Sequence, residues 1–420
     1  MVDFALSDTQ RQLRHVAREF ARNEIRSIAP ELDRRADPTE SHAGDLYRKG
    51  NALGFNAALI PEAYGGAGLG DLDFAIVLEE IAWGDAGVAL TYLGHWLALS
   101  PIIKGGSDDQ RRRWLSRIID ADRGSGLAAI CATEHGVAGD LTPREYLGAG
   151  AGDGTIQPQD FFTNYTLPRS EQREMTTRAL RAGDDFVISG TKRFITNGPI
   201  ADVYLCLATV DPSQPDALAT RAFVVPAGAP GLSIGTIENK MGHRLSITSE
   251  IIFDGVRVPA EDMLPGGSAA LRFGLENSNT MVGALSVGLA RAAYEDAMAY
   301  AKVRYKGGNR IIFHQAVGLA LADMAIAIKT ARLLVYQSAW HNDTVPEPNP
   351  VAAMVKVYCS EVAVRVTHDA LQIFGGYGYM RDLPLEKWAR DARVTPIYDF
   401  TNDMLRANII LPGLAFATEV

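Results

Sequence analysis

Residues 185–198 read DFVISGTKRFITNG, a run of valine, isoleucine, threonine and phenylalanine that begins at an aspartate and ends at a glycine. β-Branched and aromatic residues between turn residues are typical of strands. Stretches of the same character lie on both sides of this run: GLAAICATE at 126–134, DVYLCLATV at 202–210, RAFVVPA at 221–227 and SEIIFDGVRVP at 249–259. We therefore predict a β-domain in the middle of the chain, over residues 126–265.

Helical patterns precede and follow this β-domain. From Ser7, a residue type that caps helices, Leu13, Val16, Phe20 and Ile25 recur at the intervals expected on one helical face. Long helical patterns return from about residue 266, and the last of them ends at a pair of glycines. The sequence thus predicts an α+β fold with an N-terminal helical domain (1–125), a middle β-domain (126–265) and a C-terminal helical domain (266–420).

Composition and charge exclude several classes of protein. The 420 residues include 41 basic and 50 acidic side chains, giving a net charge of -9 without any block of like charge. This balance argues against a nucleic-acid-binding protein and against a polybasic membrane anchor. No spacing of histidine, cysteine and carboxylate residues suggests a metal site.

The cysteines and the apolar runs indicate the compartment. Cys131, Cys206 and Cys359 are far apart and form no C-x-x-C pair, which predicts buried free thiols in a reducing compartment. The N-terminus lacks the pattern of a signal peptide, and no apolar run is expected to reach the roughly 18 residues that cross a bilayer. We therefore expect a cytoplasmic protein without membrane insertion.

Six motifs, in this order, resemble those of the acyl-CoA dehydrogenases: PEAYGGAG (61–68), CATEHGVAGD (131–140), GTKRFITNG (190–198), MGHRLSITSEIIFDGVRVP (241–259), DALQIFGGYGYMRD (369–382) and RDARVTPIYDFTN (390–402). The resemblance covers nearly the whole chain, and the order of the motifs is more specific than any one of them. It implies a helical domain, a β-barrel or β-sandwich domain and a C-terminal four-helix bundle. It also implies FAD as cofactor, an acyl-CoA substrate and an electron-transfer flavoprotein as acceptor.

The resemblance assigns the catalytic base to Asp399. The family ends in a motif similar to I-Y-E-G-T, whose glutamate removes the α-proton of the thioester while hydride leaves the β-carbon for the flavin. Here the matching residues are Ile397, Tyr398, Asp399, Phe400 and Thr401. A carboxylate in an apolar pocket has a pKa raised towards neutrality, where general-base catalysis is most effective.

Two departures from that motif suggest an unusual substrate. Aspartate is one methylene shorter than glutamate, which withdraws the carboxylate by about 1.5 Å. Phe400 adds bulk where relatives have glycine, so we expect a cyclic or branched acyl group in contact with Tyr398 and Phe400. Some relatives take their base from the first helix of the C-terminal domain, where Ser278 matches, and Glu276 is a second candidate that would more simply be a solvated cap.

The resemblance also implies where the flavin binds. Thr133 and Thr196 match flavin-binding threonines, and Phe194 takes the place of an aromatic residue that covers the flavin face. Gly139 stands where relatives have a serine that helps to bind the FAD phosphate, so it offers only its backbone amide. Without the resemblance, Thr196 would be interpreted as a turn residue at a strand end.

Further FAD contacts are implied in the C-terminal domain, and most of them are expected to serve the cofactor of a neighbouring subunit: Arg304, Gln315, Gln372, Gly375, Gly376 and Thr401. Glycines permit the close backbone approach that phosphate binding needs. Considered alone, Arg304 would be a solvated charge at the end of a helix. Because FAD spans two subunits in this family, we expect a homodimer or homotetramer.

Other substrate contacts have simpler alternatives. His95 and Trp96 lie on the helix that resembles the one lining the family's acyl pocket, although a packed core histidine is the simpler interpretation. Arg244 lies in a segment that resembles a CoA-proximal loop, for which a β-turn is the alternative. An insertion at about 141–183 carries aromatic residues and arginines suited to a lid over the substrate entrance, or equally to a surface or subunit contact: Tyr146, Phe161, Phe162, Tyr165, Arg169 and Arg173.

Two other functions fit the same fold. The first is an oxidase, a nitroalkane-oxidase-like enzyme or an eliminase acting on a CoA ester. The second is a non-catalytic subunit of a heteromeric dehydrogenase, because Gly139, Asn279, Asp399 and Phe400 all depart from the family pattern.

Overall fold

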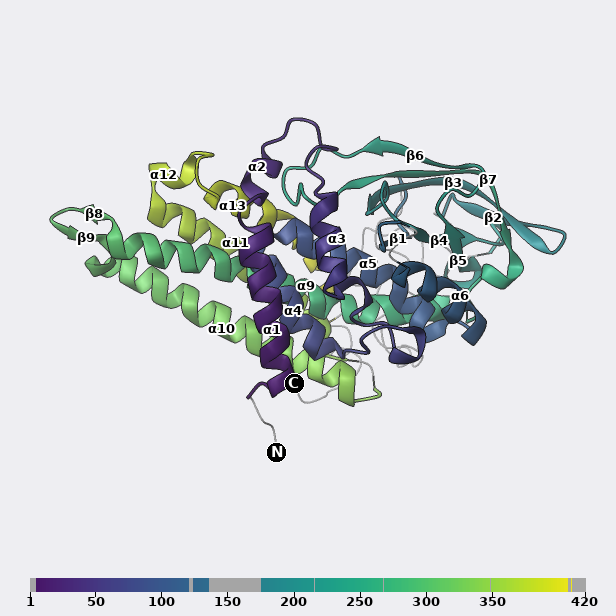
Figure 1. The fold of residues 1–420 in the computed structure, drawn as a ribbon, viewed down its shortest axis with the longest axis horizontal. Coiled ribbons are helices and arrows are strands. Elements are labelled where there is room, and N and C mark those ends of the chain that lie inside the picture. Colours follow the sequence, from purple (N-terminus) through teal and green to yellow (C-terminus); the bar gives the residue numbers. More distant parts are fainter. Residues whose placement is uncertain are drawn as a thin grey trace, which may run out of the picture.

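A computed structural model describes residues 5–120, 124–135, 175–214, 216–266, 268–347, 349–406 and 409, without the side chains of residues 216–217 and 268–277. Helices come first along the chain, strands second and long helices last, and the sheet and the helical bundle lie at opposite ends of the molecule (Figure 1). The predicted α+β organisation, with helical segments before and after a β-domain, is confirmed.

The N-terminal domain consists of short surface helices around two buried ones. Ser7 begins the first helix, because its hydroxyl accepts from the backbone N–H of Gln10 at 3.1 Å while the Gln10 side chain accepts from the backbone of Ser7. The helices are α1 (Asp8–Phe20), α2 (Ala29–Asp33), α3 (Gly44–Ala52), α4 (Asp71–Gly84), α5 (Ala86–Gly105) and α6 (Asp108–Ile119).

Helix α5 connects the two ends of the molecule, because it packs against the bundle on one side and the sheet on the other (Figure 1). It is 20 residues long and apolar enough to cross a membrane by length and composition, so the prediction that no such run exists was wrong. However, 89% of its most apolar window is buried inside the protein, as in a core helix. This is the one such helix in the part of the chain that the structure describes.

The β-domain is a seven-stranded, mainly antiparallel sheet in the order β1-β4-β2-β3-β7-β6, with β5 paired to β4. Its strands are β1 (Ala128–Cys131), β2 (Arg178–Ala182), β3 (Asp185–Thr196), β4 (Val203–Thr209), β5 (Thr220–Pro226), β6 (Leu232–Ile237) and β7 (Thr248–Pro259), and the short helix α8 (Asp216–Ala219) precedes β5. The three cysteines are buried and free, as predicted. Residues 141–174 of the expected insertion, with all six lid candidates, lie outside the described residues.

A bulge interrupts the pairing of β3 with β7 near the end of β3. The register shifts between Lys192 and Ile195, and Phe194 within it has a φ of 58°. A bulge bends a strand and redirects a side chain. Here the Phe194 ring is 57% exposed, whereas Ile195 beside it is buried.

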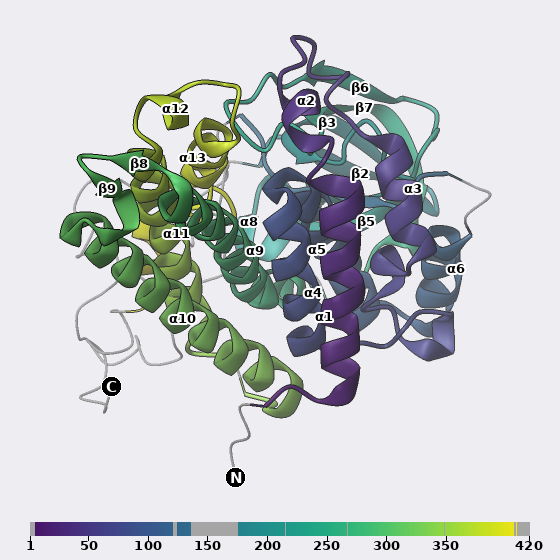
Figure 2. The same cartoon turned by 60° about the vertical axis from the view of Figure 1, so that its left-hand side comes forward.

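The C-terminal domain is a bundle of three long helices and one shorter helix (Figure 2). The helices are α9 (Ser268–Val303), α10 (Gln315–Thr344), α11 (Ala352–Phe374) and α13 (Leu385–Val394). A hairpin of β8 (Tyr305–Lys306) and β9 (Asn309–Arg310) follows α9, and the single turn α12 (Gly376–Tyr379) follows α11. The hairpin and α12 lie together at the end of the bundle farthest from the sheet (Figure 1), which we call the bundle tip.

Buried charges connect the bundle to the N-terminal domain. Glu79 and Glu80 on α4 are almost fully buried, and Arg291 of α9 donates to both carboxylates. Arg332 of α10 donates to Glu79, and Arg18 of α1 donates to Glu80. Because each buried carboxylate has arginine partners on other helices, these contacts fix how the helices lie against one another.

Candidate active site

Residues 395–402, which include Asp399, form a tight loop between α13 and the helical turn that follows, and we call this segment the base loop. Backbone bonds from Ile397 and Tyr398 to the carbonyl of Val394, and from Asn402 to the carbonyl of Pro396, close this loop. Asp399 and Phe400 inside it have left-handed φ values of 52° and 69°. Aspartate tolerates this conformation, whereas for a bulky residue such as phenylalanine it is an outlier that its surroundings must stabilise.

The Asp399 carboxylate is suited to exchanging a proton near neutral pH. Burial raises its pKa to about 6, although a hydrogen bond from Ser278 and the positive charge of Lys356 act in the opposite direction. Its Oδ2 atom is buried and has no hydrogen-bond partner among the described residues. The site therefore contains a carboxylate with one uncommitted oxygen, next to the residue that matches the base position of other relatives.

Tyr398 and His243 form an aromatic wall beside Asp399. Their rings meet edge to face with centroids 5.9 Å apart. Burial raises the pKa of the Tyr398 hydroxyl and lowers that of His243 to about 4, so both are neutral at pH 7. Within the described part of the chain, neither the hydroxyl nor the two ring nitrogens of His243 have a hydrogen-bond partner.

The three residues matched to the flavin edge lie close together where the end of β3 meets α5. Thr196 ends β3, and a Cβ added at Gly94 of α5 would lie 2.8 Å from its methyl group, so helix and strand are in close contact. The carbonyl of Thr133 accepts from the backbone of Arg193 at 2.8 Å, which holds Thr133 beside Phe194. The Arg193 guanidinium lies over the Phe194 ring, 5.0 Å from its centroid. Gly139 lies outside the described residues.

The other matched FAD residues gather mainly at the bundle tip. Arg304 follows α9, and its guanidinium lies 5.1 Å from the centroid of the Tyr377 ring of α12. Gln315 begins α10, and Gln372 lies in the last turn of α11, both with exposed side chains. Gly375 has φ 59° and ψ -136°, a conformation open essentially only to glycine, and a Cβ at Gly375 or Gly376 would meet nothing within 4 Å.

Thr401 lies away from the bundle tip. It follows Phe400, its side chain is exposed, and its hydroxyl accepts from the backbone of Met404 at 3.3 Å. Lys356, near the start of α11, touches this loop, whereas Phe374 at the end of α11 lies at the tip. Eighteen residues of helix separate them, about 27 Å at 1.5 Å per residue, so the base loop and the tip are at opposite ends of α11.

His95 and Trp96 are core residues of α5. The His95 Nδ1 atom accepts from the backbone N–H of Ala128 at 2.9 Å, which leaves Nε2 to donate to the carbonyl of Asn56 at 2.8 Å. Burial lowers the pKa of His95 to about 4. Trp96 is 4% exposed and packs near Phe74. The contacts of His95 favour the interpretation as a packed core histidine that joins α5 to β1.

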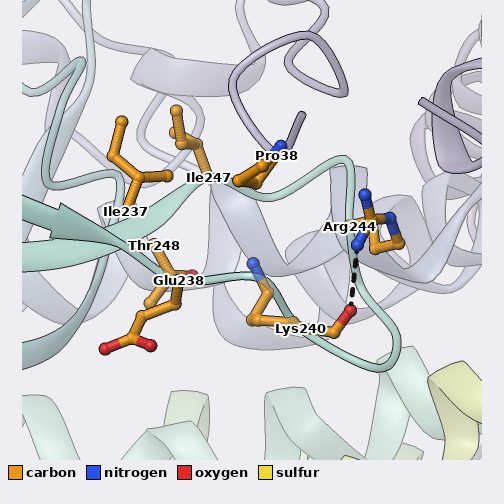
Figure 3. Close-up of a pocket in the computed structure, with 7 residues that line it drawn as sticks. All are labelled: Pro38, Ile237, Glu238, Lys240, Arg244, Ile247 and Thr248. Carbon is orange, nitrogen blue, oxygen red and sulfur yellow. Dashed lines mark hydrogen bonds between the residues drawn. The ribbon is translucent and has the colours of Figure 1, made fainter. Parts of the chain in front are cut away.

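Arg244 borders a small surface hollow (Figure 3). Its guanidinium donates to the backbone carbonyls of Asp33 at 2.9 Å, Arg35 at 2.6 Å and Lys240 at 3.2 Å, so Arg244 fixes the loop after α2 to the β6–β7 connection. The hollow contains about 190 Å³ of space, part of it open to solvent, and is lined by Pro38, Ile237, Glu238, Lys240, Arg244, Ile247 and Thr248.

Three family models match this chain: the N-terminal domain of acyl-CoA dehydrogenases over residues 7–122, the middle domain over 166–256 and the C-terminal domain over 266–411. Cyclohex-1-ene-1-carbonyl-CoA dehydrogenase from Geobacter metallireducens is 35% identical over 405 residues, which are 96% of this chain and 97% of that protein. The chain belongs to the acyl-CoA dehydrogenase family.

Solved structures of acyl-CoA dehydrogenase type agree. Butyryl-CoA dehydrogenase from Megasphaera elsdenii superposes with a TM-score of 0.83 at 31% identity, covering 97% of this chain and 98% of that one. A structure described as the electron-transferring flavoprotein of Acidaminococcus fermentans superposes with a TM-score of 0.85 at 32% identity, with the same coverage. The predicted family, its FAD dependence and its enzyme class are confirmed.

The residues of this acyl-CoA dehydrogenase fit FAD at both places. Near the end of β3, the bulge presents an exposed aromatic face at Phe194 beside the threonines. At the bundle tip, exposed glycine backbone lies near the cation of Arg304 and the amides of Gln315 and Gln372. An isoalloxazine ring suits the first place and a pyrophosphate with its ribose suits the second.

Sequence reasoning missed two residues of this site, His243 and Lys356. His243 lies inside one of the quoted motifs, but its neighbours in the sequence give no sign of its contact with Tyr398. Lys356 looks like any lysine of an amphipathic helix, yet its side chain is fully buried under the base loop. Only the packing of α11 against that loop distinguishes Lys356 from a surface lysine.

Proposed function

We propose that this acyl-CoA dehydrogenase oxidises the α,β-bond of a cyclic or branched acyl-CoA, with Asp399 as the catalytic base. The observation that carries the proposal is the Asp399 carboxylate, with a pKa near 6 and one oxygen free of partners among the described residues. A base whose pKa lies just below the working pH is both ionised and able to hold the proton that it receives.

Several residues of this chain have separate roles in the proposed reaction. The ionised Asp399 takes the proton from the α-carbon, and the electron pair left there forms the double bond as a hydride leaves the β-carbon. Bound FAD supplies the hydride acceptor. Tyr398 and His243 exclude water from one side of the carboxylate, which keeps its pKa raised, and the Ser278 hydroxyl orients it by a hydrogen bond.

The two departures from the family pattern at Asp399 and Phe400 support a cyclic or branched acyl group. The short Asp399 side chain leaves more room above the carboxylate than glutamate would, and Phe400 fills space that glycine leaves empty in relatives. The similar protein from Geobacter metallireducens acts, by its name, on a cyclohexenecarbonyl-CoA. A flat or puckered ring therefore fits this account better than an extended chain.

An electron-transfer flavoprotein is the acceptor that we propose, in keeping with the family and with the similarity to the structure from Acidaminococcus fermentans. Rapid reoxidation of the reduced enzyme by air would instead favour the oxidase alternative. Lys240 and Arg244 place two positive charges at the hollow although their hydrogen bonds go to backbone carbonyls, and we propose the hollow as an electrostatic contact for CoA (Figure 3).

We propose a homo-oligomer, because α10 exposes an apolar stripe on its outer face. Leu319, Ile326, Leu333 and Trp340 recur at seven-residue intervals and are 59%, 64%, 41% and 51% exposed. They lie about half a turn round the helix from the core-facing residues Met324, Ile328 and Val335. A regular apolar stripe of this length on a helix suits another helix, and a second copy of this chain supplies one.

The experiment is an anaerobic titration of the purified, flavin-loaded enzyme with straight-chain, branched and alicyclic acyl-CoA esters. Reduction bleaches the visible absorbance of FAD, and we expect one cyclic or branched ester to bleach it fastest. A flavin that no CoA ester reduces, but that nitroalkanes do, would contradict the proposal. Copurification of a related chain, or protein without flavin, would favour the non-catalytic subunit.

A further inference from the structure

Lys356 is a fully buried lysine whose hydrogen-bond partners both belong to the base loop. Its side chain is 0% exposed, and its ammonium donates to the backbone carbonyl of Phe400 at 2.6 Å and to the Asn402 Oδ1 atom at 2.9 Å. Among the described residues it makes no ion pair within 4 Å. Buried lysines are rare unless they are paired, so the contacts with this loop explain its position on α11.

The carbonyl that Lys356 binds belongs to the strained residue of the loop. Phe400 has a φ of 69° directly after Asp399 with 52°, and phenylalanine gains nothing of its own from a left-handed conformation. Rotation of the loop to right-handed values would move the Phe400 carbonyl away from the ammonium. The charge-assisted hydrogen bond therefore opposes that rotation, and any rotation there would also move the Asp399 carboxylate.

A second contact holds the other side of the same loop to α11. The Asn402 side chain donates to the Ser360 hydroxyl at 3.0 Å, one turn along α11 from Lys356. The backbone N–H of Asn402 donates to the carbonyl of Pro396 at 3.0 Å and closes the loop. Lys356 and Ser360 thus hold Phe400 and Asn402 from one face of a rigid helix.

We infer that Lys356 is a positioning residue that holds the left-handed turn at Asp399 and Phe400, and so sets where the carboxylate of the base lies. This inference rests on the proposed function, in which Asp399 is the base. It gives α11 a role in catalysis that no sequence motif indicated. It also explains how a bulky residue occupies a position where the family has glycine.

The charge of Lys356 acts on the same carboxylate. Burial lowers the pKa of Lys356 to about 8, although Asp399 and Glu361 favour its charged form. The ammonium in turn opposes the effect of burial on Asp399. The charged or polar groups that face this pair are Ser278 from α9, Glu361 from α11, and Tyr398 and Asn402 from the loop. Loss of the ammonium should therefore raise the pH at which Asp399 becomes ionised.

The test uses flavin-loaded Lys356→Met with the CoA ester that bleaches the wild type fastest. We expect unchanged flavin content and similar half-saturation by substrate. The bleaching rate at saturation should fall on the order of ten- to a hundredfold, because a misplaced base lowers the rate and not the binding. The midpoint of the rate against pH should move above that of the wild type.

Three further variants separate the effect of losing the charge from the effect of losing the contact with the turn. Lys356→Gln keeps an N–H donor without the charge, so it should raise the pH midpoint while losing less of the rate. In a Phe400→Gly background, where the turn carries no strain, Lys356→Met should cost a smaller factor in rate. Lys49→Met, which removes an exposed lysine outside the bundle, should leave both the bleaching rate and the pH midpoint where they are.

Wild-type rate and pH midpoint in both Lys356→Met and Lys356→Gln would overturn the inference. An equal loss from Lys356→Met in the wild-type and Phe400→Gly backgrounds would show that Lys356 does not act through the turn. Undiminished bleaching by Asp399→Asn is a separate result, because it removes the proposed base and with it the proposed function.

Discussion

Phe400 combines two features that rarely occur together, a bulky side chain and a left-handed backbone. The left-handed conformation costs about 1–2 kcal/mol for a residue with a Cβ, and glycine would avoid that cost. Because this conformation lowers stability, a phenylalanine there, next to the proposed base, is more simply explained by contact with the substrate. Its ring is therefore expected to select the substrate.

We predict that Phe400→Gly shifts specificity towards straight-chain acyl-CoA esters. Removing the ring makes room beside Asp399 for an extended chain. Differences of a few methylenes in an apolar pocket change kcat/KM by about tenfold or more. The ratio of anaerobic bleaching rates for a straight-chain and a cyclic ester measures the shift. Phe400→Leu is the control, because it keeps most of the bulk and should keep the preference; an unchanged ratio in Phe400→Gly would contradict the prediction.

At the residue scale, the sequence predicts a base at Asp399 but not the residues that surround it. Asp399 could be assigned because it stands in a motif that resembles a family pattern. Lys356 lies 43 residues before it on another element, and its role depends on how α11 meets the loop. His243 likewise acquires its neighbour Tyr398 only when the β6–β7 connection and the loop after α13 come together in the fold.

One buried carboxylate, that of Glu134, joins the segment after β1 to the segment before β2. Glu134 accepts from the backbone N–H groups of Thr176 at 2.6 Å and Thr177 at 3.0 Å, and from the Lys192 ammonium of β3 at 2.7 Å. Burial alone would raise the pKa of Glu134, but Lys192 and the threonine bonds lower it to about 2. This contact holds Thr133 beside the bulge of β3.

We predict that Lys192→Met lowers the free energy of unfolding by about 3–5 kcal/mol, because it leaves a buried carboxylate without its cation. The double variant with Glu134→Gln should recover part of this loss. Equilibrium unfolding in denaturant measures both. A loss below about 1 kcal/mol, as for an exposed ion pair, would contradict this account.

We predict that Glu134 also makes the stability of the fold depend on pH. The pKa of Glu134 is depressed in the fold, so its stabilisation is complete above the ordinary value of 4.5 and is lost as pH falls from there towards 2. The total is about 3 kcal/mol for a pKa lowered by this much. Glu134→Gln should therefore flatten the acid limb of stability between pH 5 and about 2; an acid limb as steep as that of the wild type would contradict the assignment.

At the element scale, periodicity predicted the strand β3 that ends at Thr196, and the long helices of the bundle. It could not predict the bulge that turns Phe194 outwards, because a bulge depends on the partner strand β7. The expected length of apolar runs was wrong for α5, whose apolar sequence is interrupted by glycine, histidine and serine but reaches spanning length as a whole helix. That helix is apolar all round because both the bundle and the sheet cover it.

For the whole molecule, the matched FAD residues of one chain lie in two separate places. The flavin-edge threonines are at the sheet, whereas Arg304, Gln315 and Gly375 are at the bundle tip on the far side (Figure 1). By these assignments, one chain carries residues for two different parts of FAD at its opposite ends. A second copy of the chain is expected to bring the missing half.

We predict that hybrid oligomers regain flavin that neither variant binds alone. Arg304→Glu damages the half-site at the tip, and Thr196→Asp places a negative charge at the flavin edge. In a two-fold symmetric dimer of one chain of each kind, one site is intact and one is doubly damaged, so flavin content should be about half. Absorbance of doubly tagged hybrids measures it; hybrids without flavin would mean that each chain binds its own cofactor.

We predict that Ile326→Glu with Leu333→Glu reduces the oligomeric state, because two charges would interrupt the apolar stripe of α10. Light scattering coupled to size-exclusion chromatography gives the mass. Leu53→Glu, at an equally exposed position outside the bundle, is the control and should keep the wild-type mass. The wild-type mass in the double variant would exclude this face as a subunit contact.

Anaerobic stopped-flow reduction of Asp399→Asn by the best CoA ester of the wild type tests directly whether Asp399 is the base. We predict that the variant retains FAD and still binds the ester, but that its bleaching rate falls by about 10²- to 10⁴-fold. In the wild type the rate should rise with pH through about 6, as Asp399 ionises. A variant that bleaches as fast as the wild type would show that another group removes the α-proton.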